Sequence, residues 1–177
     1  MSLIVVGLLG GCFASRPQGH VGFAKAKRLG ELSGTYRNLG EGDPKETATK
    51  HYLSEIIWPG LFDPDSSIAT IEVRVSGDTG LAMRALGDSG LAVKEQTFVA
   101  GKDFQFRSGR LRIYARSSVP SAESGGLFYV HETMELGIDQ KGQGKQKRTE
   151  SVIGAAYLVL PIALRSTTEV RFVRIGD

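Results

Sequence analysis

Apolar and polar residues alternate along several stretches of the second half of the chain. In residues 69–76 the odd positions Ile71, Val73 and Val75 are apolar and the even positions are polar. A period of two is typical of a β-strand with one buried and one exposed face. Further strands are expected at residues 91–99, 104–106, 111–116, 128–138 and 168–175.

Short turn motifs separate these stretches. Gly77-Asp78-Thr79-Gly80 and Gly87-Asp88-Ser89-Gly90 recur ten residues apart, and glycine and aspartate favour tight hairpin turns. Residues 108–109 and 139–144 have similar turn chemistry. The pattern predicts an all-β antiparallel meander that forms a barrel or a strongly curved sheet, because closure removes unpaired strand edges.

One segment has helical spacing instead. Asp43 is suited to an N-cap, Pro44 to the first helical position, and Glu46 completes a capping box. Apolar residues then recur at positions 48, 52 and 56, before Trp58-Pro59-Gly60 ends the segment. We therefore expect one α-helix over residues 43–58, packed on the sheet or plugging one end of it.

The chain opens with an apolar run, residues 3–9, that leads through two glycines to its only cysteine, Cys12. The run is far shorter than the roughly 20 residues of a membrane-spanning helix, but it suits the apolar region of a cleaved signal. Leu9-Gly10-Gly11-Cys12 resembles the lipobox of bacterial lipoproteins, which implies cleavage before Cys12 and acylation of its sulfur. Ordinary signal cleavage after Ala14 and a cytosolic protein with an apolar first strand remain as alternatives.

These observations predict three parts: a signal peptide (residues 1–11), a lipidated Cys12 with a flexible tether (residues 12–31), and one β-rich domain (residues 32–177). The size of the chain, 177 residues, suits a single core, and 23 glycines against 6 prolines favour short strands and tight turns. The net charge is +3, with cations gathered in residues 16–28 and 141–148. They would lie near anionic headgroups or be simply solvated. Nucleic-acid binding is not expected, since no basic run is interleaved with aromatics.

Few motifs point to catalysis. Gly87-Asp88-Ser89-Gly90 resembles the nucleophile loop of chymotrypsin-type serine proteases, but its near-copy at residues 77–80 favours a simple turn. His20, His51 and His131 are widely spaced, so neither a metal site nor a cofactor is predicted.

Glu132 is the most unusual polar residue. Its neighbours at two-residue spacing are all apolar, so alternation points its carboxylate toward the core face, where it would need a partner such as Arg84 or Arg112. We consider Glu132 and Arg84 as polar contacts in a ligand site that Tyr36 and Trp58 would line. A structural ion pair, a bulge that turns Glu132 outward, and aromatics that only fill the core are the alternatives.

Two family resemblances bear on location and fold. Leu32-Ser33-Gly34-Thr35-Tyr36 is faintly similar to the first strand of lipocalins. The lipobox, this Gly-Thr-Tyr, the hairpin at residues 135–142, Leu160-Pro161 and Arg171-Phe172 together resemble small uncharacterised proteobacterial lipoproteins. The resemblance implies an envelope location and a β fold.

The function expected from the sequence is a non-catalytic, lipid-anchored periplasmic protein that binds an apolar ligand or an envelope partner protein. Phe13, where an aspartate would favour inner-membrane retention, favours the outer membrane. The alternative is a hydrolase of envelope material, in which a carboxylate or serine would meet His131.

Overall fold

The computed structural model describes residues 9–46, 49–61, 68–77, 79–113, 117–118, 126–156 and 160–176. These residues form two β-sheets, one short α-helix and one 3₁₀ helix, η1 (Leu29–Leu32). The prediction of an all-β fold with a single α-helix is confirmed.

The first sheet, here called the long sheet, has β1 at one edge. Its spatial order is β1 (Leu9–Ser15), β11 (Leu160–Phe172), β10 (Gly144–Ala156), β9 (Gly126–Ile138), β7 (Arg110–Ile113) and β6 (Phe104–Arg107), with β8 (Ser117–Ser118) also paired to β9. The second, the short sheet, has the order β12 (Arg174–Gly176), β2 (Gly34–Arg37), β3 (Ile68–Ser76), β4 (Gly80–Gly87) and β5 (Ala92–Val99). β1 runs parallel to β11, and every other neighbouring pair within the two sheets is antiparallel.

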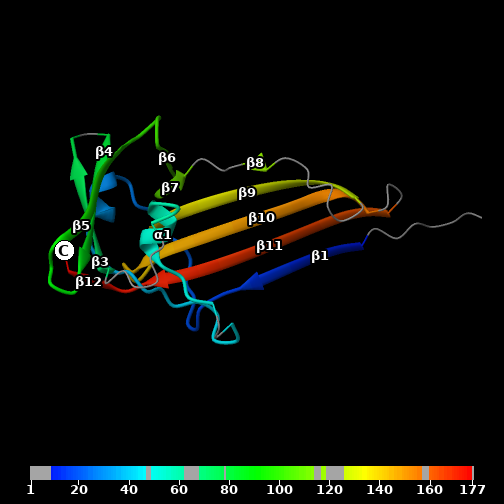
Figure 1. Ribbon diagram of the computed structural model, residues 1–177, viewed down its shortest axis with the longest axis horizontal. Helices are drawn as coiled ribbons and strands as arrows, with labels where there is room; N and C mark the ends of the chain where they lie inside the picture. The colour runs from blue at the N-terminus through cyan, green and yellow to red at the C-terminus, as the bar shows by residue number, and fades with distance from the viewer. Residues whose placement is uncertain are drawn as a thin grey trace, which may run out of the picture.

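The three longest strands, β9, β10 and β11, project far beyond the short sheet and α1, with β1 alongside β11 (Figure 1). Each of the three has 13 residues, so each is about 40 Å long at about 3.3 Å per residue. We call β1, β9, β10 and β11 the blade. Its root is the part around β10 residues 144–148, and its free end is the part around β10 residues 152–156.

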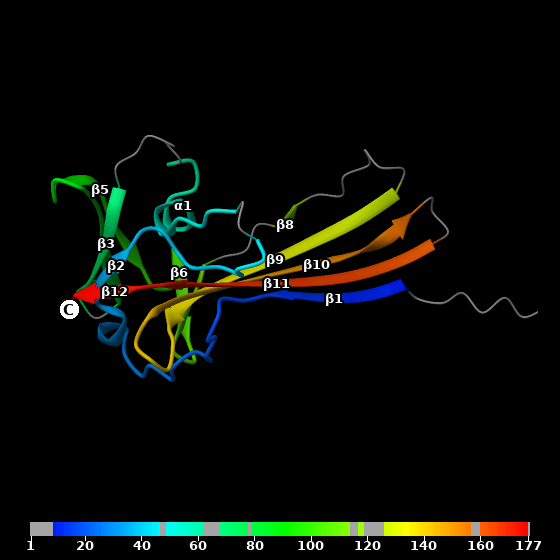
Figure 2. The same cartoon turned by 90° about the horizontal axis from the view of Figure 1, so that it is seen from below.

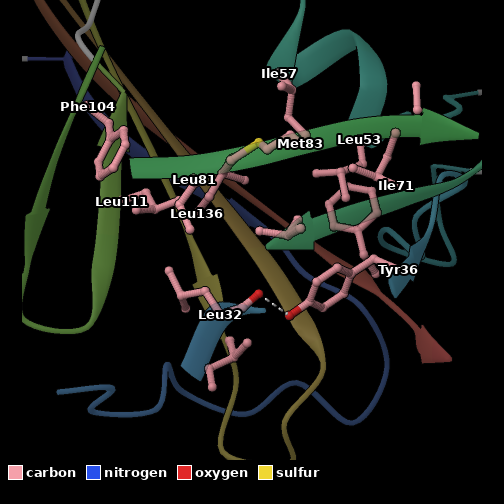
Figure 3. Packing of buried hydrophobic residues seen from close by; sticks show 14 of the residues in the cluster. Leu32, Tyr36, Leu53, Ile57, Ile71, Leu81, Met83, Phe104, Leu111 and Leu136 are labelled. Atoms are coloured by element: carbon pink, nitrogen blue, oxygen red, sulfur yellow. Dashed lines mark hydrogen bonds between the residues drawn. The ribbon is translucent and has the colours of Figure 1, made fainter. Parts of the chain in front are cut away.

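The two sheets pack on each other only at the root. There Leu136 and Phe172 of the long sheet meet residues of the short sheet such as Ile71 and Leu81, which are fully buried. Figure 3 shows this packing, with the Tyr36 hydroxyl donating a hydrogen bond to the Leu32 carbonyl. Among the described residues the strands therefore form two packed sheets, and they do not close into one barrel.

The helix is much shorter than predicted, because α1 spans only Leu53–Ile57. Asp43 caps a turn instead, accepting a hydrogen bond from the amide of Lys45 at 2.9 Å. Tyr52 forms an extended bridge with Leu39, so the helix starts only after it. Position 48, expected on the helical stripe, lies outside the described residues.

Buried Asn38 fixes the start of α1. Its Oδ1 accepts the amide of Ser54 at 2.8 Å, its carbonyl accepts the amide of Leu53 at 2.9 Å, and its Nδ2 donates to the Ile68 carbonyl at 3.0 Å. One side chain thus ties α1 to the start of β3.

The predicted tether also differs from the structure. Cys12 lies within β1, which pairs with β11 from Leu9↔Ile162 to Ser15↔Thr168. The chain then crosses the root of the blade, where Phe23 bridges Asp139 and Ala26 is buried. Apolar residues spaced irregularly along residues 21–29 are enough to hold this segment in place. Residues 1–8 of the predicted signal lie outside the described residues.

None of the helices in the described part of the chain has the length and apolar character needed to cross a bilayer.

Candidate functional site

The blade has two faces that are covered differently. Directly paired residues point to the same face, and successive residues alternate between faces. The core face carries Leu136, Gln146 and Val170 at the root, and the reverse face carries Lys145 and Glu169. Figure 2 shows α1 and β3 to β5 on one side of the root and the segment that follows β1 on the other.

A groove of about 780 Å³ lies on the core face, between α1 with its flanking residues and the blade. This volume is within the range of ligand sites, which is about 300 to 1,000 Å³. The side formed by residues 46–60 is lined by Glu46, Thr49, Lys50, His51, Tyr52, Glu55, Ile56, Pro59 and Gly60. The side formed by the long sheet is lined by Ile113, Glu132, Met134, Gln146, Arg148 and Thr168.

Glu132 lies in this groove, on the core face as the alternation predicts. Its partner is Arg148 of the neighbouring strand β10, whose Nε lies 3.0 Å from Glu132 Oε1. Arg148 also lies 3.8 Å from Glu150. The Glu132 side chain is 28 % exposed, so its carboxylate is paired but still accessible from the groove.

The two arginines expected as partners of Glu132 lie elsewhere. Arg84 pairs with Glu72 at 3.1 Å and with Glu95 at 3.3 Å on the short sheet. Arg112 lies on the reverse face of the long sheet, 3.4 Å from Glu135. The structure therefore brings neither arginine to Glu132.

The two predicted aromatic liners belong to the core. Tyr36 is 4 % exposed and Trp58 is 7 % exposed. The Trp58 indole donates to Gln96 Oε1 at 2.8 Å and lies at a tilt 6.3 Å from the ring of Phe98. Neither Tyr36 nor Trp58 lines the groove, although Pro59 and Gly60, which follow Trp58 in the chain, do.

The apolar cavity enclosed between α1 and the two sheets is too small for an acyl chain. Tyr36, Leu53 and Phe172 are among the residues around an apolar cavity of about 50 Å³. A cavity of that size has room for a few water molecules at most. An apolar ligand therefore does not fit inside this cavity.

The reverse face of the root holds a buried charge cluster. Lys145 and Glu169 are both 6 % exposed, and Lys145 Nζ lies 2.6 Å from Glu169 Oε2. The same carboxylate oxygen lies 2.7 Å from His20 Nδ1, and Lys145 also donates to the Val21 carbonyl at 2.6 Å. Burial lowers the pKa of His20, against the raising effect of the Glu169 carboxylate. These contacts tie residues 20–21 to the blade.

Cys12 is exposed on the reverse face. It pairs with Arg165 of β11, which is opposite Ser151 of β10, which in turn is opposite His131 of β9. The next row on this face, toward the free end, is apolar: Tyr129, Ile153 and Ala163. Cys12 therefore lies in the last polar row before an apolar surface.

His131 lies on the face opposite the groove and contacts Thr133 Oγ1 at 3.4 Å. The structure thus places His131 and Glu132 on opposite faces of the sheet, whereas Ser151 is directly paired with His131 on the reverse face. In the described part of the chain no three His, Cys, Asp or Glu residues cluster in a way that could hold a metal ion.

Comparison with models of protein families, with curated proteins and with solved structures finds no match.

Most residues of the groove could not be identified from the sequence. Gly144 to Ser151 of β10 contain no apolar residue, so they give no strand signal, although Gln146 is buried. The turn at residues 139–143 is the signal that could have found Arg148. A hairpin closed by Ile138↔Gly144 places Glu132 opposite Glu150 and diagonal to Arg148.

Proposed function

We propose that this protein is a lipid-anchored, non-catalytic binding protein on the periplasmic face of the outer membrane, with the groove as its binding site for an envelope partner protein. The observation that carries the proposal is the groove, which combines ligand-site volume with an accessible ion pair. An internal apolar ligand is not part of the proposal.

The lining of the groove suits a peptide segment of a partner. Ile56, Ile113 and Met134 offer apolar contact, and Lys50, Glu55 and Arg148 offer charges of both signs. Most of these side chains keep some exposure, so a peptide can reach them. Such a mixed surface is typical of polar, reversible protein contacts.

The anchor is supported by the lipobox-like residues and by the exposure of Cys12. Cleavage before Cys12 would remove Leu9 to Gly11 from β1 and leave four pairs with β11, from Cys12↔Arg165 to Ser15↔Thr168. Arg16 and His20, which come just after β1 in the chain, contact Glu169 and would keep the shortened β1 in place.

The anchor is tested by expressing the full chain in a Gram-negative host and measuring the intact mass of the membrane-extracted protein. We expect a chain that begins at Cys12 and carries acyl groups, whereas Cys12→Ala keeps its first eleven residues. An unmodified wild-type chain of full length would contradict the anchor.

The groove is tested by placing a photo-crosslinking amino acid at Glu55 and, as control, at Lys94 of β5, which is exposed on the short sheet. We expect one discrete crosslinked species from position 55 that Glu132→Lys in the same chain removes. Equal crosslinking from both positions, or no effect of Glu132→Lys, would argue against the groove.

A further inference from the structure

We infer that the reverse face of the blade is a membrane-contact surface, which lies against an anionic bilayer through an apolar patch at the free end and cations toward the root. The inference deepens the proposed function by assigning the membrane side of the molecule. It does not require the acyl chains.

The apolar patch is formed by Tyr129, Ile153 and Ala163, which are directly paired across three strands. Tyr129 is 53 % exposed and Ile153 is 61 % exposed, although both lie within paired strands of the sheet. Ala155 and Pro161 continue the patch one row further toward the tip. Large apolar side chains gathered in this way mark a contact site, and the core face of the blade also exposes Phe13 and Leu164.

Cations follow the patch along the same face. Exposed Arg165 stands in the adjacent row, and Arg16, whose side chain is 51 % exposed, lies near Glu169. Residues 22–28 cross this face of the root, as Phe23 lies beneath Arg110 and close to Gly137. Their exposed cations are Lys25, Lys27 and Arg28.

Carboxylates on this face are few and already paired. Among the described residues, Glu135 is shared by Arg110 and Arg112, Glu169 is shared by Lys145 and Arg16, and Glu41 pairs with Arg171. The reverse face is therefore positive. Each cation near an anionic bilayer contributes about 1 kcal/mol of attraction.

Cys12 points to the same side. Its row, which also contains Arg165, lies directly between the apolar patch and the cations at the root, so acyl chains on its sulfur would enter the bilayer on the side of Ala163. The apolar patch, the anchor position and the cations thus share one face, while the groove opens on the other. A partner in the groove would be held away from the membrane.

If the blade lies parallel to the membrane surface, the unpaired backbone groups at its edge can also be hydrated. In the described residues β1 has no strand on its outer edge, and unpaired amides and carbonyls are very unfavourable in hydrocarbon. A sheet that rests on the interface keeps this edge hydrated and still buries its apolar side chains at the headgroup boundary.

The test is sedimentation of the full chain carrying Cys12→Ser with vesicles of neutral or anionic phospholipid. No variant can be acylated, because all carry Cys12→Ser, and all keep residues 1–11. The result therefore does not depend on whether Cys12 of the wild type carries acyl chains. Ile153→Glu changes the reverse face, and Leu164→Glu, at a position 41 % exposed on the core face, is the matched control. Tyr129→Glu and Phe13→Glu form a second such pair.

We expect binding to anionic vesicles to fall about tenfold or more with Ile153→Glu or Tyr129→Glu and to change little with the two controls. Replacing Lys25, Lys27 and Arg28 by glutamine should also weaken binding, and salt should mimic this effect. Equal losses from both faces, or no loss from either, would overturn the inference. So would self-association of the Cys12→Ser chain that Ile153→Glu abolishes, since the patch would then contact a second copy.

Discussion

The root and the free end of the blade are made by the same three strands in the same register, yet they differ in what covers them. At the root the core face packs under the short sheet and α1, and the reverse face is crossed by residues 16–26. At the free end the described residues leave Tyr129, Ile153 and Leu164 exposed. In the part of the chain that the structure describes, the root thus has buried side chains in addition to backbone pairing, whereas the side chains of the free end are at least partly exposed.

This comparison separates stability from binding. Polar side chains at the root, such as Lys145 and Gln146, are buried because the elements packed on both faces of the blade cover them. Apolar side chains at the free end are exposed, so their burial contributes little to the stability of the fold. Residues that stabilise the fold should therefore be concentrated at the root, and residues that serve the membrane at the free end.

The largest effect should come from Glu169→Ala. It leaves the Lys145 ammonium buried without its carboxylate, which typically costs about 3 to 5 kcal/mol of unfolding free energy. The control is Glu150→Ala, on the same blade at a position 38 % exposed, where about 0.5 kcal/mol is expected. Urea denaturation measures both, and similar losses would mean that the root is not specially stabilised.

Two leucines of the long sheet give a second comparison. Leu136→Ala removes a side chain that is 7 % exposed in the core and should lower the unfolding free energy by about 3 kcal/mol. Leu164→Ala, at a position 41 % exposed, should change it by less than about 0.5 kcal/mol. A large loss at Leu164 would show that the free end is packed against something in solution.

A smaller effect is expected where α1 is fixed over the root. Asn38→Ala leaves the Ser54 amide and the Ile68 carbonyl without their partner, which should cost about 2 kcal/mol. Asn38→Asp keeps the acceptor for Ser54 but sets a buried carboxylate oxygen against the Ile68 carbonyl, so it should cost at least as much as Asn38→Ala. If both variants unfold like the wild type, α1 does not depend on Asn38.

The fold could be predicted where one face of a strand is buried and the other is exposed. β3 matches its predicted range because Ile71 and Val73 alternate with polar residues. The Ser108-Gly109 turn was also predicted, and both residues have positive φ angles. At β10 the rule fails, since the partners that bury Lys145 come from residues 20–21 and Glu169, far away in sequence.

The candidate site was predictable only in part. Strict alternation placed Glu132 on the core face, but its partner depends on the hairpin register, which propensity alone does not give. Tyr36 and Trp58 were expected to line a ligand site because aromatic side chains suit both pockets and cores. Their burial is decided by how the two sheets pack, which is a property of the whole chain.

The smallest expected effect is on pH dependence. Burial lowers the pKa of His20, so the folded state binds a proton less readily than the unfolded chain. The stability that neutral His20 contributes is therefore fully present above the ordinary histidine pKa of about 6.5. It is lost as the pH falls through the lowered pKa of the folded state. Denaturation between pH 7.5 and pH 5 should show a shallower loss for His20→Gln than for the wild type, and parallel curves would exclude this role.

The most direct test of the membrane side uses spin labels on the two faces of the free end. In the full chain with Cys12→Ser, one label is placed by Ile153→Cys and the other by Leu164→Cys, and accessibility to oxygen is measured with and without anionic vesicles. We predict that vesicles raise the oxygen accessibility of the label at position 153 and leave the label at position 164 in water. Equal changes at both positions, or a change at position 164 alone, would contradict the account.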